Sequence, residues 1–282
     1  MEMKMIMAFA VVGMLCLGGG FLVGSSMSDD RSQTLNIAGS SSVGPLMTTY
    51  VQEYSKLTDS VKFNLSVTDS TDGVNKVLSG AADIGMSSSK ISDAAVAAGA
   101  VATEICKDAI VVVVSPKLFD GGVTNLTPAQ MKGIYEGTIT NWQDVGFNAS
   151  VPIANTHVFI REEGSGTRDA FESLIGKPTL ISGLSTQNST GLMRSAVSSA
   201  EYAIGYISLG SLNTATDKAV SVNGVPPSIA NAMNGTYELV RSFYLVTKGA
   251  PTGTAALFID WILSPTGQKH LGSSFVPLYA VP

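Results

Sequence analysis

Four short turns rich in serine, threonine and glycine have the composition of an oxyanion-binding site. They are residues 40–42 (Ser-Ser-Ser), 70–72 (Ser-Thr-Asp), 87–89 (Ser-Ser-Ser) and 164–167 (Gly-Ser-Gly-Thr). Three of them fall where a predicted strand passes into a predicted helix, and the first N–H groups of a helix have no acceptor within it. Helix capping alone would explain any single turn. An anion site is indicated only if the turns converge.

The segment 161–167, with the sequence REEGSGT, carries a stronger signal. Arg161 ends an apolar run predicted as a strand, so its guanidinium would lie at the carboxyl end of that strand, where open α/β sheets bind ligands. Arginine recognises a tetrahedral oxyanion through two parallel hydrogen bonds. The alternative is a solvated loop whose Arg–Glu ion pair has little energetic value. The combination of arginine, acid and Ser-Gly-Thr favours an anion site.

The elements that must position these turns alternate along the chain. Apolar runs predict strands at 35–38, 62–68, 83–86, 109–114, 158–160, 202–209 and 243–246. Helices are predicted to begin near Ser42, Ser70, Thr127, Gly164 and Ser264, and a proline follows Thr127 and Ser264 as in a first turn. Strands that alternate with helices predict an α/β fold with mostly parallel sheets.

Composition excludes several classes of function. The chain has 282 residues, 17 of them basic and 22 acidic, and a net charge of −5 without a cluster of lysine or arginine, which argues against a nucleic-acid partner. With 45% hydrophobic residues it is not disordered. Cys16, Cys106, His157 and His270 lack the spacing of metal ligands, so we expect neither a metal nor a cofactor.

The N-terminus predicts export. Residues 6–23 carry no charge, and small residues follow up to Ser25. Residues 1–25 are therefore a signal peptide or a membrane anchor, and 26–32 a polar linker. Cleavage after Ser25, lipidation at Cys16 and an uncleaved anchor all remain open. The mature protein is expected in the periplasm or at the cell surface, with the N-terminus as a possible membrane anchor.

Over nearly all of the remaining chain, the sequence resembles the phosphate-binding proteins of ABC transporters, which are type II periplasmic-type binding proteins. The segments that carry the resemblance are 39–43 (GSSSV), 83–88 (DIGMSS), 141–145 (NWQDV), 161–167 (REEGSGT), 203–206 (AIGY), 264–268 (SPTGQ) and 275–278 (FVPL). The segment 161–167 is the most specific of them, since it resembles the family's phosphate loop.

The resemblance implies a set of ligand residues. These are Ser41, Ser42, Ser70, Ser88, Arg161, Glu163, Ser165, Gly166 and Thr167. Arg161 would make the charged hydrogen bonds, the serines and the 165–167 turn would supply hydroxyl and N–H donors, and Glu163 would orient Arg161. Some family members carry an aspartate where this chain has Ser88, and that aspartate accepts the proton of bound phosphate. Selectivity for phosphate over sulfate is therefore less secure here.

The resemblance also implies a two-lobed fold with the ligand in the cleft between the lobes. We expect lobe one to comprise 33–113 and 240–282 and lobe two 114–239, with crossings near Val114 and Val240. The function implied is the capture of inorganic phosphate by a monomer and its delivery to the permease of an ABC transporter.

Other functions stay open: binding of another tetrahedral oxyanion such as sulfate or molybdate, an envelope sensor or adhesin on the same fold, and an exported phosphatase or hydrolase. The enzyme is disfavoured because the sequence has no Gly-x-Ser-x-Gly elbow and no recognisable Ser–His–acid arrangement.

Overall fold

The computed structural model describes residues 33–280. The strands are β1 (Gln33–Ser40), β2 (Val61–Thr68), β3 (Ile84–Ser87), β4 (Ala100–Val114), β5 (Asn125–Leu126), β6 (Phe159–Arg161), β7 (Ser185–Gln187), β8 (Ile204–Ser208), β9 (Lys218–Ala219), β10 (Ser221–Val222) and β11 (Val240–Lys248). The α-helices are α1 (Gly44–Ser55), α2 (Ser70–Ser79), α3 (Asp93–Ala97), α4 (Pro116–Asp120), α5 (Pro128–Glu136), α6 (Gly166–Leu174), α7 (Thr190–Ser199), α8 (Ile229–Met233), α9 (Gly253–Leu263) and α10 (Pro265–Lys269). Three short 3-10 helices lie at Trp142–Val145, Asn155–His157 and Leu209–Ser211.

The main sheet is mixed, which corrects the expectation of mostly parallel pairing. Its strands run in the order β2-β1-β3-β11-β4-β8, with β9 also paired to β4. Pairing is parallel among β1, β2 and β3, whereas β11 is antiparallel to both β3 and β4, and β4 is antiparallel to β8. The sequence pattern could not reveal this, because a fully buried apolar strand looks the same in either orientation.

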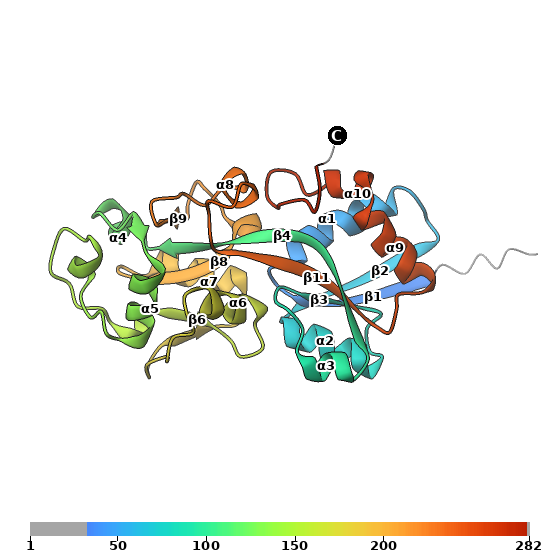
Figure 1. Ribbon diagram of the computed structural model, residues 1–282, viewed down its shortest axis with the longest axis horizontal. Helices are drawn as coiled ribbons and strands as arrows, with labels where there is room; N and C mark the ends of the chain where they lie inside the picture. Colours follow the sequence, from blue (N-terminus) through green and yellow to red (C-terminus); the bar gives the residue numbers. More distant parts are fainter. Residues whose placement is uncertain (1–32, 281–282) are drawn as a thin grey trace, which may run out of the picture. The chain divides into compact units, whose positions relative to one another are not determined.

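The two long strands β4 and β11 pair in antiparallel orientation and run through the centre of the described structure (Figure 1). One hydrophobic core draws its residues from 35–106 and 243–275, and a second draws them from 109–239 together with Val276. The chain thus changes from one core to the other inside β4 and again at the start of β11. The expected lobe limits at 113/114 and 239/240 stay predictions.

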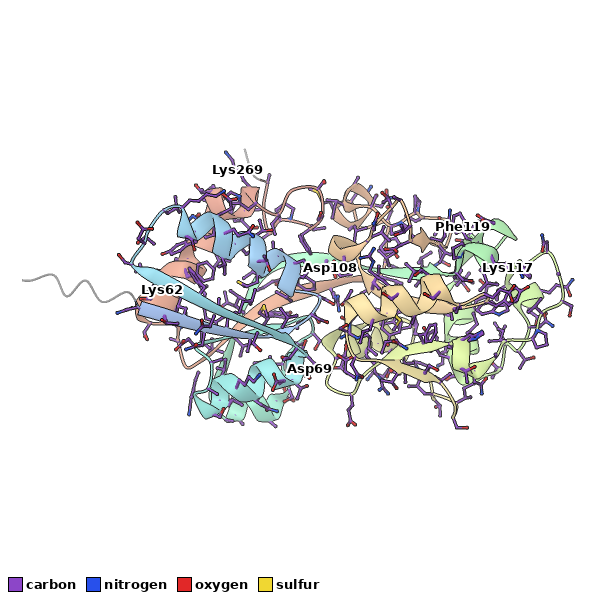
Figure 2. The ribbon with its side chains drawn as sticks, turned by 180° about the vertical axis from the view of Figure 1, so that it is seen from behind. Lys62, Asp69, Asp108, Lys117, Phe119 and Lys269 are labelled. Carbon is purple, nitrogen blue, oxygen red and sulfur yellow. The ribbon has the colours of Figure 1, made fainter. Side chains whose placement is uncertain are left out.

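A buried ion pair lies where β4 and β11 pass between the two cores (Figure 2). Asp108 of β4 and Arg241 of β11 are register partners, and Arg241 donates from Nε and Nη2 to Asp108 Oδ2 at 3.1 and 2.9 Å. Ser208 donates to the other carboxylate oxygen at 2.7 Å. Asp108 is fully buried, so these hydrogen bonds offset the cost of removing its charge from water.

The capping residues in the sequence explain where helices α5 and α10 begin. Thr127 caps α5 and forms the predicted reciprocal capping box with Gln130, with Pro128 in the first turn. Ser264 caps α10 by accepting from Gly267 N, ahead of Pro265 in the first turn. The first helix begins at Gly44 rather than at Ser42, because residues 41–43 form a turn in which Val43 N donates to Ser40 O.

Within residues 33–280, the structure contains no helix that is both long enough and apolar enough to span a bilayer. The predicted signal peptide or anchor and the linker lie outside the described residues.

Candidate functional site

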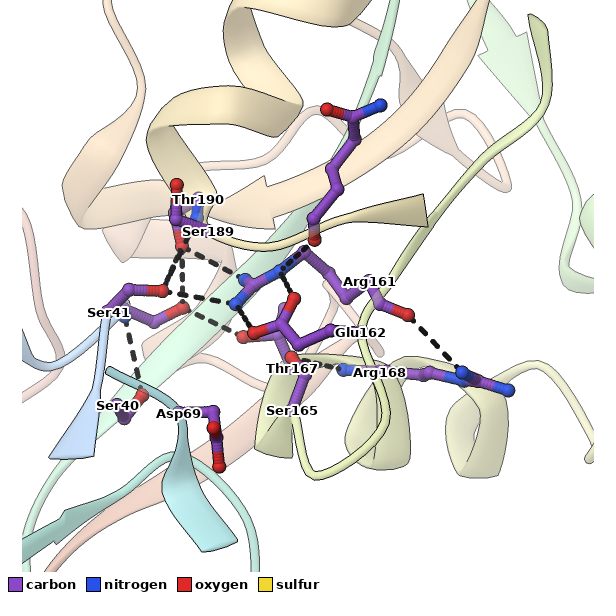
Figure 3. Close-up of polar contacts among 12 residues, drawn as sticks. Ser40, Ser41, Asp69, Arg161, Glu162, Ser165, Thr167, Arg168, Ser189 and Thr190 are labelled. Atoms are coloured by element: carbon purple, nitrogen blue, oxygen red, sulfur yellow. Dashed lines mark hydrogen bonds and ion pairs between the residues drawn. The ribbon is translucent and has the colours of Figure 1, made fainter. Parts of the chain in front are cut away.

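Two of the four hydroxyl-rich turns, 40–42 and 164–167, gather around Arg161, and a further turn at Ser189 and Thr190 joins them (Figure 3). Arg161 is the last residue of β6, a three-residue strand, and its side chain points to the starts of α1 and α7. Ser41 and Ser42 precede α1, and Thr190 is the first residue of α7. Thr167 belongs to the first turn of α6. Ser41 and Ser42 belong to the part of the chain that forms one hydrophobic core, and Arg161, Thr167 and Thr190 belong to the part that forms the other. The site therefore lies between the two cores.

The guanidinium of Arg161 is almost fully buried, at 2% exposure, and is held along one edge. Its Nε donates to Glu162 Oε2 at 2.7 Å and to the carbonyl oxygen of Gln187 at 3.1 Å. Its Nη2 donates to Glu162 Oε1 at 2.6 Å. The other edge faces the hydroxyls: Nη1 donates to Thr190 Oγ1 at 3.2 Å, and Nη2 donates to Ser41 Oγ at 3.1 Å.

Arg161 sets the direction of the hydrogen bonds among these hydroxyls. A guanidinium can only donate, so Thr190 Oγ1 and Ser41 Oγ both act as acceptors toward it. Ser41 Oγ also accepts from Thr190 N at 3.3 Å. Each hydroxyl therefore keeps its hydrogen to donate, either to the other hydroxyl across 3.4 Å or to an anion. Ser42 Oγ lies 2.8 Å from Thr167 Oγ1 and 3.1 Å from Thr190 Oγ1, which completes a cluster suited to donating to an anion.

A second pair of hydroxyls lies against the start of α6. Ser70 Oγ accepts from Ser88 N at 3.1 Å and lies 3.3 Å from Ser88 Oγ, and both residues are buried. Gly166, the first residue of α6, lies so close that a Cβ there would be 2.6 Å from Ser70 Oγ and 2.8 Å from Ser88 Oγ. Nearby, Thr71 N donates to Gly164 O at 3.2 Å. The starts of α2 and α6 are thus in direct contact.

The structure corrects the role expected of Glu163. The carboxylate that orients Arg161 belongs to Glu162, which pairs with two guanidinium nitrogens and is 15% exposed. Glu163 is exposed. Strand β6 ends at Arg161, and Glu163 lies in the turn that follows, so its side chain is exposed while Glu162 stays beside the guanidinium.

The expected N-terminal turn of α6 is present. Ser165 caps the helix, since its Oγ accepts from Arg168 N at 3.4 Å. The N–H groups of the first turn, which include those of Gly166 and Thr167, have no acceptor within the helix and carry the positive end of its dipole. This turn provides donors without adding a second full charge to the site.

Sequence analysis missed Thr190, whose hydroxyl lies within hydrogen-bond distance of Arg161, Ser41 and Ser42. The signal was present: Ser189 caps α7 through Leu192 N, and Met193 and Val197 lie four residues apart on the buried face of that helix. The capping serine with apolar residues at helical spacing could have predicted a helix beginning at Thr190. Its placement beside Arg161 could not be read from the sequence, because it depends on how β7 pairs with β6.

The chemistry of this cluster is binding rather than catalysis. Hydroxyls, helix N-termini and a guanidinium that is fixed by a carboxylate are all donors to an oxyanion. Among residues 33–280, no group of three or more histidine, cysteine, aspartate or glutamate side chains could hold a metal ion.

Comparison with known proteins agrees with this fold. A family model described as a PBP superfamily domain matches residues 24–266. The structure of a putative phosphate ABC transporter substrate-binding protein from Clostridium perfringens, with bound phosphate, is 32% identical and covers 88% of this chain and 100% of that one, with a TM-score of 0.80. An ABC-type phosphate transport receptor from Vibrio cholerae is 28% identical and covers 87% and 100%, with a TM-score of 0.70. The phosphate-binding protein PstS of Bacillus subtilis is 25% identical over 278 residues, 95% of this chain and 90% of its own.

The chain belongs to the PBP superfamily. Within it, the chain belongs with the substrate-binding proteins of phosphate ABC transporters that the C. perfringens protein represents. The family resemblance and the two-lobed α/β fold expected from the sequence are thereby confirmed. These relatives are transport proteins that bind a substrate, which also confirms the expectation that the chain is not an enzyme.

Proposed function

We infer that this chain captures inorganic phosphate outside the cytoplasm and delivers it to an ABC transporter. One observation carries the inference: the buried guanidinium of Arg161 is fixed by Glu162 and faces hydroxyls from several helix starts. A buried cation surrounded by neutral donors is complementary to a small oxyanion and to little else. The named functions of the relatives support phosphate as that anion.

The proposed ligand set extends the one implied by the sequence. Arg161 supplies the charge, and Ser41, Ser42, Ser70, Ser88 and Thr167 supply hydroxyls. Ser165 and Gly166 supply the first turn of α6. We add Thr190, since its hydroxyl lies within hydrogen-bond distance of Arg161 and Ser42. We leave Glu163 out and assign the orientation of Arg161 to Glu162.

The proposed mechanism is closure of two lobes around the anion. Lobe one would comprise 33–113 and 240–282, and lobe two 114–239; the change of core within β4 and at the start of β11 supports a division near these limits. The contact of the start of α6 with the Ser70 and Ser88 turns, which the structure has, would belong to the closed state. The closed monomer would then dock on the membrane permease. Export through residues 1–25, with or without an anchor, belongs to the same proposal.

The test is calorimetry of the ligand-free protein with phosphate, arsenate, sulfate and molybdate. We expect saturable binding of phosphate, and protection against unfolding of about 2.7 kcal/mol at roughly 100-fold excess over the dissociation constant. Arg161→Ala serves as the matched control, because it should remove both effects. Absence of saturable oxyanion binding by the wild-type protein would contradict the proposed function.

A second candidate is a carrier for another tetrahedral oxyanion, and Ser88 favours keeping it. Ser88 is fully buried beside Ser70 and carries no charge to repel a fully ionised sulfate. The same titrations separate the two candidates. Sulfate or molybdate bound more tightly than phosphate would move the second candidate to first place.

A further inference from the structure

Tyr206 ends the Ala-Ile-Gly-Tyr segment at 203–206, and its side chain lies beside Arg161, under the site. Its hydroxyl accepts a hydrogen bond from the backbone N–H of Arg161 at 3.1 Å. Its ring stacks on Phe171 of α6, with centroids 4.0 Å apart and planes 17° apart. Tyr206 is fully buried, and burial raises the pKa of its phenol, so the hydroxyl remains protonated. One side chain therefore contacts both β6, which carries Arg161, and α6.

We propose that Tyr206 is a positioning residue that fixes Arg161 relative to the first turn of α6, so that both reach the same anion. The proposal rests on the proposed function of this site. Binding groups need to be held within about 0.5 Å of their working geometry by a supporting layer of packed and hydrogen-bonded residues. Tyr206 provides such a layer beneath two elements at once.

The local structure around Arg161 shows why an outside support is needed. Strand β6 has only three residues, and its partner β7 also has three and is paired with β6 in a separate two-stranded sheet. In contrast, β8 pairs with β4 along five residues and belongs to the main sheet. Val158, just before β6, forms a single bridge with Ile204 of β8, and Tyr206 adds a second link to β8 at the far end of β6, beside Arg161.

The backbone of Arg161 is held on both sides. Tyr206 accepts from its N–H, and Arg168 of α6 donates from Nη1 to its carbonyl oxygen at 3.3 Å. Arg168 is in turn paired with Glu172 at 2.7 Å. The contacts of the Arg161 peptide groups therefore lead either to β8 or to α6, and the Tyr206–Phe171 stack joins these two supports.

Tyr135 offers a matched control in the same aromatic cluster. It is also buried, and its hydroxyl donates to the carbonyl oxygen of Phe159 at 3.0 Å, two residues before Arg161 on the same strand. Its ring meets Phe171 edge-on at 5.4 Å. Tyr135→Phe thus removes a buried hydroxyl bonded to β6 without touching the peptide groups of Arg161.

The experiment compares Tyr206→Phe with Tyr135→Phe by calorimetry with inorganic phosphate and by unfolding without phosphate. We expect both variants to lose stability, and only Tyr206→Phe to weaken phosphate binding, by about 10-fold to 100-fold. A purely structural role would change the unfolding of both variants and the dissociation constant of neither. Wild-type affinity in Tyr206→Phe, or an equal loss of affinity in both, would overturn the proposal.

Phe171→Leu covers the case in which Tyr206→Phe does not fold. It keeps the hydroxyl of Tyr206 and removes the stacked ring that fixes α6, so we expect it too to weaken phosphate binding about tenfold. Wild-type affinity in Phe171→Leu would then count against the proposal. Phosphate binding by the wild-type protein is measured first, so a failure of the proposed function is seen before any variant is compared.

Discussion

Replacing Gly166 by alanine adds one methyl group at the contact between α6 and the Ser70 and Ser88 turns. The added Cβ would lie 2.6 Å from Ser70 Oγ, 2.8 Å from Ser88 Oγ and 2.8 Å from Ser89 N. The hydroxyls can rotate away, but the backbone nitrogen cannot. An ordinary contact at Cβ begins near 3.4 Å, so the start of α6 must withdraw by about 0.6 Å from Ser89.

A displacement of this size should weaken phosphate binding without lowering the stability of the phosphate-free protein. Misplacing a binding group by about 1 Å can cost on the order of 100-fold, so we expect the dissociation constant for phosphate to rise about 10-fold to 100-fold, or about 1.4 to 2.7 kcal/mol. Alanine is a better helix former than glycine, so unfolding without phosphate should be unchanged or slightly shifted toward higher temperature. Calorimetry and thermal unfolding measure the two quantities separately.

Gly191 supplies the control for this substitution. It lies in the first turn of α7, and a Cβ there would meet only Ser189 Oγ, at 3.9 Å. Gly191→Ala should therefore leave phosphate affinity unchanged. If Gly166→Ala binds phosphate within about threefold of the wild type, α6 does not approach the Ser70 and Ser88 turns in the bound protein, and the reasoning from close contact is refuted.

Substitutions at three positions, Arg161, Thr190 and Ser88, test the remaining parts of the site. Arg161→Ala should weaken phosphate binding by about 2–5 kcal/mol in calorimetry, and Arg161→Lys should recover little because the fork of donors is lost; near-normal affinity in Arg161→Ala would place the site elsewhere, and near-normal affinity in Arg161→Lys would show that the fork is not needed. Thr190→Val should cost about 1–2 kcal/mol in the same assay, whereas Thr186→Val, on the exposed side of β7, should cost nothing; equal behaviour of the two would remove Thr190 from the ligand set. Ser88→Asp should sharpen the preference for phosphate over sulfate in a competition titration, because an added carboxylate accepts the proton of phosphate and repels sulfate; an unchanged ratio would show that Ser88 does not face the anion.

The sequence predicted that the turns lie close together, but it did not predict which side chains contact one another there. The REEGSGT segment predicted a strand ending at Arg161 and a helix beginning near Gly164. The structure ends the strand at Arg161 and begins the helix at Gly166, with Ser165 as its cap. It could not predict which acid would pair with the guanidinium, because Glu162 and Glu163 are equivalent in composition and differ only in the direction of their side chains. That direction is set by the backbone of a loop, which has no periodic pattern to read.

Two features of the fold depend on pairing between strands that are far apart in the sequence, and they could not be predicted from it. The apolar run at 109–114 was predicted as a strand, but its antiparallel neighbours β8 and β11 come from far along the chain. Thr190 reaches Arg161 only because β7 pairs in parallel with β6 and places α7 directly behind the site. Long-range pairing of this kind leaves no local signature in residue spacing.

The position of β11 also decides when the protein can fold. This strand lies between β3 and β4 in the sheet, although it is synthesised long after both. Phe243 of β11 and Phe258 of α9 fill the same core as Leu35 and Ile37 of β1. The N-terminal half therefore stays without its central strand until synthesis is nearly complete, and contacts of such high sequence separation form slowly. A chain that ends before residue 240 keeps every proposed ligand residue, yet it would expose the unpaired edges of β3 and β4 and aggregate on expression.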